Sequence, residues 1–277
     1  MPRLDRLVTL YYFRPLRKVG PGTDPAIPIL MYHSISEAYE RVHPYYRVNT
    51  SPKLFADQMC FLATQGYKSI SLNELTGKVL GTKCVVITFD DGYSDFYTEA
   101  FPRLQEYGFQ ATVFLATAYV GGESFKGKEC LNWGQVRELY AAGITFGSHT
   151  HTHPQLKNLD QSAIAQELRR SKNIIEDKLG HAVTDFSYPY QFPEENREFR
   201  GLIGEELTSA GYARCVTTII GRYREGDNAM LIKRLPVNTD DDQALFGAKL
   251  NGDYDWLHTP QCMVKRARLI MHKVVED

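Results

Sequence analysis

The sequence predicts an α/β barrel, and three observations lead to this fold class. Short apolar runs alternate with longer segments of helical spacing, which is typical of βαβ units and a parallel sheet. About seven such units follow one another without a dinucleotide-binding glycine fingerprint after the first strand, which favours a closed barrel over an open sheet. Polar motifs end several of the apolar runs, where β/α barrels place their reactive groups.

The elements follow in order after a Gly/Pro-rich linker, GPGTDPAIP. IPILMYH is expected to be a buried strand, and PKLFADQMCFLATQGY a helix that ends at Gly66, because glycine readily adopts the left-handed cap. The β-branched run CVVITF predicts a strand that ends in the acids of DDG. The remaining elements are the helix FYTEAFPRLQEYG, the strand ATVFLAT, the helix WGQVRELYAAG, the strand ITFGSHTHTHP, the helix QSAIAQELRRSKNIIEDKLG, the strand DFSYPY, the helix EFRGLIGEELTSAGY and the strands ARCVTTI and MLIKRLPVN.

Composition excludes several classes of protein. A hydrophobic fraction of 43% is enough for a large core, and 32 basic against 33 acidic residues give no basic excess of the kind that nucleic-acid binders show. The five cysteines are scattered, odd in number and lack a CxxC pair, which argues against a disulfide framework and against a cysteine zinc site.

We interpret residues 1–26 as an N-terminal extension and linker, and residues 27–277 as a single catalytic domain. The apolar run LVTLYYF in the extension is short for a secretory signal, lacks a small-residue cleavage site and is too short to span a bilayer. A cytoplasmic location is therefore expected. A second hypothesis is peripheral membrane contact through a surface-lying amphipathic segment. That segment combines Arg3, Arg6, Arg14, Arg17 and Lys18 with Leu7, Leu10, Tyr11 and Phe13.

Two motifs at strand ends carry metal-binding chemistry. Asp90 and Asp91 end the run VVITF, so one carboxylate could bind a metal while its neighbour acts as a general base; a turn acid that starts a helix is the structural alternative. In FGSHTHTHPQL, a strand would place all three histidines on one face, whereas a helical turn would pair His149 with His153, and Pro154 disfavours the helical form. Two histidines and a carboxylate form a known catalytic zinc site.

These motifs resemble those of a known family. TFDDG (88–92), SHTHTH (148–153) and SYPYQ (187–191) resemble the three signature motifs of the NodB-homology polysaccharide deacetylases, carbohydrate esterase family four, in the variant found among poly-N-acetylglucosamine deacetylases. The similarity runs from LMYHSI (30–35) to KRLPV (233–237) and implies a distorted (β/α)7 barrel.

The resemblance also implies roles for individual residues. The metal ligands would be Asp91, His149 and His153, and Asp90 would be the general base. Thr150 would hold the loop, and His151 occupies the variable position of the motif and would point outward or support the ligands. The metal would be Zn²⁺ or another divalent transition metal such as Co²⁺ or Ni²⁺.

The chain departs from the family in its third motif. Ser187 stands where the commonest form has an arginine that pairs with the base, and Gln191 ends the motif. Arg234 is the candidate replacement, with an exposed arginine on the barrel rim as the alternative. His33, in the Y-H pair of MYHSI, is the candidate general acid, and a structural histidine is the alternative.

The expected function is metal-dependent removal of an acetyl group from an N-acetylated sugar or glycan in surface-polysaccharide biosynthesis. Tyr188 and Tyr190 are candidates for the sugar-binding platform. The expected substrate is a lipid- or nucleotide-linked saccharide, and no nucleic acid partner is expected. The alternatives are a hydrolase of a non-sugar amide or imide on the same fold, and a catalytically silent carbohydrate-binding domain.

Overall fold

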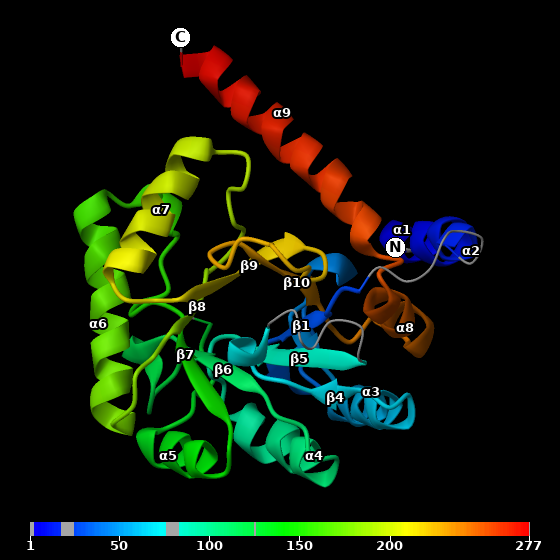
Figure 1. The fold of residues 1–277 in the computed structure, drawn as a ribbon, viewed down its shortest axis with the longest axis horizontal. Helices are drawn as coiled ribbons and strands as arrows, with labels where there is room; N and C mark the ends of the chain where they lie inside the picture. Colours follow the sequence, from blue (N-terminus) through cyan, green and yellow to red (C-terminus); the bar gives the residue numbers. More distant parts are fainter. Residues whose placement is uncertain (1–2, 18–24, 76–82, 125, 277) are drawn as a thin grey trace.

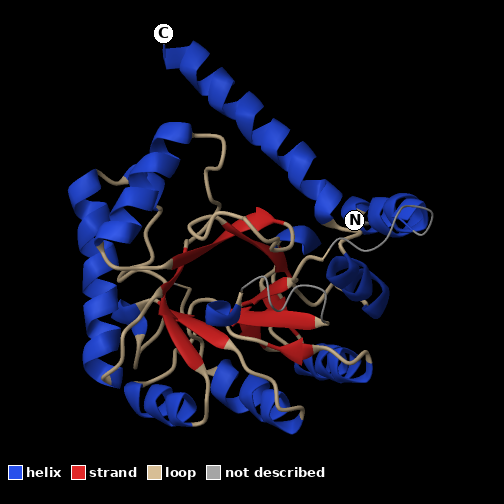
Figure 2. Cartoon of the chain, viewed as in Figure 1, coloured by secondary structure: helices blue, strands red, loops and turns tan. Residues whose placement is uncertain are grey.

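A closed parallel barrel forms the centre of the protein (Figure 1, Figure 2). The computed structural model describes residues 3–17, 25–75, 83–124 and 126–276, and for Arg17 and residues 268–276 it describes the backbone. Strand β1 pairs with β5 on one side and with β10 on the other, so the order β1-β10-β9-β8-β7-β6-β5 returns to β1. This ring of seven parallel strands confirms the (β/α)7 barrel that the sequence predicts.

The strands are short and mostly buried. Two of them, β2 and β3, form a small separate sheet. Strand β4 pairs with the first half of β5, and β6 pairs with the second half, so both use the same edge of β5. The strands are β1 (Ile29–Tyr32), β2 (Ser34–Ile35), β3 (Asn49–Thr50), β4 (Lys68–Ser69), β5 (Cys84–Phe89), β6 (Thr112–Leu115), β7 (Thr145–Ser148), β8 (Asp185–Ser187), β9 (Arg214–Ile220) and β10 (Ile232–Pro236).

Helices surround the barrel, as Figure 2 shows. Their ends carry ordinary caps: the Ser51 and Asp160 side chains accept N–H groups in the first turns of α3 and α6, and α6 ends at Gly180 in the left-handed conformation. The helices are α1 (Leu4–Val8), α2 (Arg14–Arg17), α3 (Pro52–Thr64), α4 (Phe101–Glu106), α5 (Trp133–Ala141), α6 (Gln161–Leu179), α7 (Arg197–Ser209), α8 (Gln243–Asn251) and α9 (His258–Glu276).

Strand alternation decides which side chains enter the barrel. Along β5, Val85, Ile87 and Phe89 belong to the core between the sheet and the helices, whereas Cys84 and Val86 belong to a separate apolar cluster inside the barrel. Along β10, Leu235 faces outward and Ile232 faces inward. Thr88 and Arg234 lie two positions after Val86 and Ile232, so their side chains also point into the barrel.

Some elements were not predicted from the sequence. Strands β2, β3 and β4 are two residues long, which is too short to show a period, and α8 follows the last predicted strand. The predicted helix FYTEAFPRLQEYG begins as a π-helical turn, Phe96–Ala100, before α4. The N-terminal extension is helical from α1 through a second π-helical turn, Thr9–Phe13, to α2, and residues 18–24 of its linker lie outside the described residues.

Helix α9 extends away from the barrel, as Figure 1 shows. Its first residue lies close to the N-terminal helices, since Trp256, two residues before α9, stacks on Phe13. Within the described ranges, we find no helix that combines the length and the apolar character required to cross a bilayer.

Candidate active site

The polar motifs meet at the carboxyl end of the barrel. Asp90 and Asp91 follow β5, His149 follows β7, and Ser187 is the last residue of β8. Because parallel strands end on the same rim, residues nearly 100 positions apart in the chain come into contact there. The hydroxyl of Ser187, for example, donates a 3.0 Å hydrogen bond to Oδ1 of Asp90.

Asp91, His149 and His153 form a buried cluster. Oδ1 of Asp91 lies 3.5 Å from Nε2 of His149 and 3.3 Å from Nε2 of His153, and the two Nε2 atoms are 3.2 Å apart. This Asp91 oxygen is buried and accepts no hydrogen bond from the described residues. A buried carboxylate oxygen facing two imidazole nitrogens is a donor set that suits a divalent transition metal.

Hydrogen bonding sets the tautomer of His149 for metal binding. Its Nδ1 lies 2.7 Å from the carbonyl oxygen of Ser187, and a carbonyl can only accept, so Nδ1 carries the proton. The lone pair is therefore on Nε2, which faces Asp91. Burial and the neighbouring His149 lower the pKa of His153 to about 3, so its ring is neutral at pH 7 and also has a lone pair to offer.

The backbone is strained at the same positions. Four non-glycine residues in the described part of the chain have positive φ angles: Asp91 (71°), Thr150 (69°), His153 (55°) and Tyr190 (57°). Such conformations cost about 1–3 kcal/mol each and persist where surrounding contacts enforce them, most often at functional sites. All four lie in the motifs singled out from the sequence.

The histidine stretch is neither a continuous strand nor a helix. Strand β7 ends at Ser148, and the chain then turns so that His149 and His153 face each other with ring centroids 4.7 Å apart. Thr150 stabilises the turn: its hydroxyl accepts the N–H of His153 at 3.0 Å and donates to the carbonyl of His149. His151 points away, and its Nδ1 lies 2.9 Å from the hydroxyl of Thr117.

Glu167 on α6 also holds this loop, although no sequence pattern distinguishes it from the other polar residues of its helix. One carboxylate oxygen accepts the N–H groups of His151 and Thr152, each at 2.8 Å, and the other accepts the Thr152 hydroxyl. These three contacts fix the backbone between the two histidines that face Asp91. The docking of α6 against the loop creates this link, so it is a product of tertiary packing.

Asp90 is bound by Arg234, which enters the barrel from β10 two residues after Ile232. The guanidinium makes two parallel hydrogen bonds to the carboxylate, at 2.8 and 2.7 Å, and further bonds to Ser187, Thr88 and the Thr217 carbonyl. Arg234 is fully buried, so the exposed-rim alternative for this residue is wrong. Burial is the largest single influence on the pKa of Asp90 and raises it, but the charge and hydrogen bonds of Arg234, together with the nearby histidines, outweigh burial and hold this pKa well below its ordinary value.

Ser187 therefore takes part in the network that an arginine would complete in the commoner motif. Its hydroxyl accepts from Arg234 at 2.9 Å and donates to Asp90, so it bridges the pair. The polar residue at the end of an apolar run was the available signal for this role.

His33 directly follows β1. The carbonyl of Tyr32, the residue before His33, accepts a hydrogen bond from the backbone N–H of Asp90, so the two strand ends lie side by side. The ring is close enough to Asp90 and Asp91 for their charges to raise its pKa, but burial has the larger effect and the net shift is downward.

The two tyrosines of the third motif differ. Tyr190 is 42% exposed, and its ring lies 4.6 Å from that of His153, at the mouth of the site. Tyr188 is 1% exposed and packs against Phe192 and Phe199 in the core, which corrects the prediction that its ring contacts substrate. An extended strand would place both rings on one side, but β8 ends at Ser187 and Tyr190 has a positive φ angle of 57°, so the chain turns here and the two rings separate.

Known protein families and proteins are similar to this chain in sequence. The profile of the family described as polysaccharide deacetylase matches residues 77–203. YxkH of Bacillus subtilis, whose name assigns it to the polysaccharide deacetylases, is 32% identical over 228 residues, which cover 80% of this chain and 75% of YxkH. The poly-beta-1,6-N-acetyl-D-glucosamine N-deacetylase of Staphylococcus aureus is 26% identical over 162 residues, covering 54% of this chain and 56% of that protein.

Solved structures share the fold. IcaB from Ammonifex degensii superposes with a TM-score of 0.70 at 24% identity, covering 82% of this chain and 98% of IcaB. The deacetylase PplD of Streptococcus pyogenes, solved in complex with acetate, gives a TM-score of 0.69 at 24% identity, covering 83% of this chain and 99% of PplD.

Proposed function

Because the chain belongs to the polysaccharide deacetylase family, we propose that it removes the acetyl group from an N-acetylated sugar with a divalent metal ion held by Asp91, His149 and His153. The observation that carries the proposal is the division between two adjacent carboxylates. Asp91 faces the Nε2 atoms of two imidazoles, whereas Asp90 is bound by a buried guanidinium. Asp91 is thus placed to bind a cation, whereas Asp90 is held in its ionised form, which is the form that a base requires.

Each side chain has a role in this reaction. A bound metal ion would supply a Lewis acid that polarises the acetyl carbonyl and makes water more acidic. Asp90 is ionised at neutral pH because of Arg234, and it would accept a proton from the attacking water. Arg234 and Ser187 would keep its carboxylate in position. His33, whose pKa burial lowers, would first take up a proton in the site and then pass it to the departing nitrogen, so that the proton lost by water is replaced by the one gained by the amine.

Zinc is the proposed metal, since two histidines and one carboxylate leave a fourth position for water in catalytic zinc sites; cobalt, nickel and iron accept the same ligands. The exposed ring of Tyr190 beside His153 would stack on the sugar.

We further propose a role in surface-polysaccharide biosynthesis, with a lipid- or nucleotide-linked N-acetyl amino sugar as the substrate. The name of the Staphylococcus aureus relative, a poly-N-acetylglucosamine deacetylase, supports a glycan as the substrate class. We place the protein in the cytoplasm. All five cysteines lie in the described part of the chain and none forms a disulfide, which suits a reducing compartment.

Acetate release tests the proposal. A panel of N-acetylated sugars and oligosaccharides would be incubated with chelated protein, with protein reloaded with zinc, and with zinc-loaded Asp90→Asn. The matched control is Asp57→Asn, an exposed carboxylate on α3. We expect release that requires zinc, that falls at least about 10²-fold in Asp90→Asn and that is unchanged in Asp57→Asn.

Other results have distinct meanings. Release that survives complete metal removal would contradict the proposed mechanism. Stoichiometric zinc binding with no acetate released from any sugar would favour a non-sugar amide or imide as the substrate. Failure to bind metal would favour a carbohydrate-binding protein.

A further inference from the structure

We propose that the N-terminal helical segment, Leu4–Arg17, binds the surface of an anionic lipid bilayer. The segment comprises α1, the π-helical turn Thr9–Phe13 and α2. Its polar side chains face the protein and its apolar side chains face outward, which is the reverse of the usual arrangement for a helix on a globular domain. The proposal is independent of the deacetylase chemistry.

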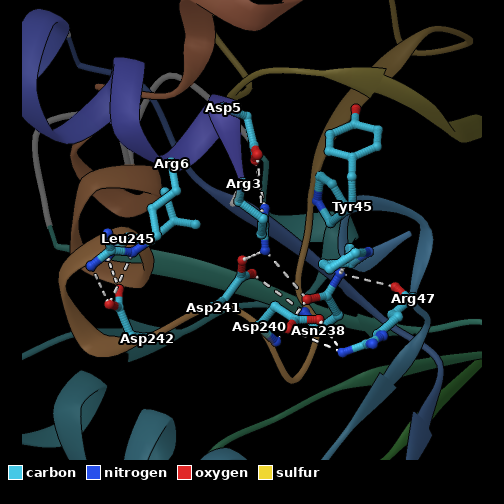
Figure 3. A network of polar contacts seen from close by, with 12 residues as sticks. Arg3, Asp5, Arg6, Tyr45, Arg47, Asn238, Asp240, Asp241, Asp242 and Leu245 are labelled. Atoms are coloured by element: carbon cyan, nitrogen blue, oxygen red, sulfur yellow. Dashed lines mark hydrogen bonds and ion pairs between the residues drawn. The ribbon is translucent and has the colours of Figure 1, made fainter. Parts of the chain in front are cut away.

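Charged and polar contacts attach this segment to the barrel, as Figure 3 shows. Arg3, 8% exposed, bonds Asp241 at 2.7 Å and Asp5 at 2.6 Å, and Arg6 bonds Asp242. The two acceptor residues Asp241 and Asp242 lie in the loop between β10 and α8, so the attachment is on the same rim as Asp90 and Asp91.

The polar contacts continue along the buried side of the segment. The hydroxyl of Tyr254 donates to Asp5 at 2.7 Å, and the indole N–H of Trp256 donates to Thr9, which is fully buried, at 3.0 Å. Phe13 stacks on Trp256 with centroids 4.9 Å apart. These contacts hold the helix in one orientation.

The opposite side presents large apolar residues to solvent. Of eleven such exposed side chains in the described residues, five lie within the fourteen positions of this segment. Two more, Met263 and Val264, lie on the first turns of α9, which starts just after the Trp256 contact. The five are Leu4 (72% exposed), Leu7 (39%), Tyr11 (76%), Tyr12 (61%) and Leu16 (56%). A concentration of this kind marks an interaction surface.

The positive charge of the segment favours an anionic partner for this apolar surface. Residues 1–18 contain five basic residues and one acidic residue, a net charge of +4, while the whole chain carries −1, so the remaining residues carry −5. The apolar residues thus lie on a basic segment of an otherwise acidic protein, although two of its five basic residues, Arg3 and Arg6, pair with Asp241 and Asp242. Leucines and tyrosines beside arginines are typical of helices that lie in the interfacial region of anionic membranes.

The shape of the surface favours lipid over a second protein. The segment lies at the edge of the molecule (Figure 1), and its exposed residues include neighbours such as Tyr11 and Tyr12 that diverge around the helix. A fluid bilayer can surround apolar side chains that point in different directions, whereas a protein partner would need a matching surface for each of them. Binding would bring the active-site rim close to a membrane-attached substrate.

Vesicle sedimentation with the full 277-residue chain tests the proposal. Vesicles of phosphatidylcholine alone would be compared with vesicles containing phosphatidylglycerol, each at low and at high salt. We expect binding to the anionic vesicles that high salt weakens. The double variant Leu4→Ser/Tyr11→Ser should reduce the partition coefficient at least about tenfold, and Arg14→Gln about fivefold. Arg137→Gln, the same charge change on the exposed side of α5, is the matched control and should have no effect.

Light scattering and thermal unfolding accompany this measurement. Both substituted apolar residues are exposed, so we expect the double variant to keep the Tm of the parent chain. Absence of binding to anionic vesicles would overturn the proposal, as would an equal loss of binding in Arg137→Gln. A dimer that Leu4→Ser/Tyr11→Ser converts to monomers would overturn it in favour of a second copy of the chain.

Discussion

Replacing Arg234 by methionine gives the sharpest test of the network around Asp90. The change keeps an unbranched side chain in the barrel but removes the guanidinium and all five of its hydrogen bonds, two of them to Asp90. Among the described residues, the carboxylate of Asp90, which is 2% exposed, then keeps a single hydrogen-bond partner, the Ser187 hydroxyl. An uncompensated charge in such a position costs about 3–5 kcal/mol of unfolding free energy at pH 7.

The loss should depend on pH in a defined direction. In the parent chain the pKa of Asp90 is below its unfolded value of about 3.9, so the carboxylate stabilises the fold above about pH 4 and this contribution is lost as the pH falls through the native pKa. Without Arg234, burial dominates and raises this pKa above the unfolded value. The carboxylate then disfavours the fold at neutral pH, and the difference between variant and parent should shrink toward pH 4.

Urea unfolding of the chelated proteins at pH 7 and pH 4 measures both effects. Arg103→Gln is the control, because its partner Glu106 and Arg103 itself are about half exposed, and we expect a change of about 0–1 kcal/mol. Adding Asp90→Asn to Arg234→Met should restore part of the stability at pH 7. A loss no larger than that of the control, or one equal at both pH values, would refute the reasoning.

Three further predictions concern the site. Glu167→Ala should weaken zinc binding about 10–100-fold by releasing the loop between the histidines, as measured by calorimetry; unchanged affinity would show that the loop keeps its form without α6. His151→Ala should leave zinc affinity nearly unchanged whereas His149→Ala should abolish tight binding, and the opposite ranking would mean that the ligands are misassigned. Tyr190→Ala should raise KM with little change in Tm, whereas Tyr188→Ala should cost about 3–5 kcal/mol of stability; an altered KM with normal stability in the second variant would return Tyr188 to the substrate site.

The sequence by itself determined the barrel and the members of the candidate site. Apolar runs alternating with helical segments follow from local periodicity, which does not depend on distant residues. The adjacent acids of TFDDG and the histidines of SHTHTH stand at predicted strand ends, and a parallel barrel gathers such ends on one rim. Strands of two residues, such as β2 and β4, were not predicted because they are too short to show a period.

Only the tertiary structure decided which of these side chains contact one another and which of them face the site. That Arg234 is buried against Asp90, rather than exposed on the rim, depends on strand alternation and on closure of β10 onto β1, which brings residues 144 positions apart into contact. The turn after β8, where Tyr190 adopts a positive φ angle, separates Tyr188 in the core from Tyr190 at the mouth. The polar attachment of the N-terminal helix likewise depends on the loop after β10, so its outward apolar face could not be read from the helix alone. Contacts of this kind join segments that are far apart in the chain, and the distance between such segments in space is set by the fold and cannot be predicted from local sequence.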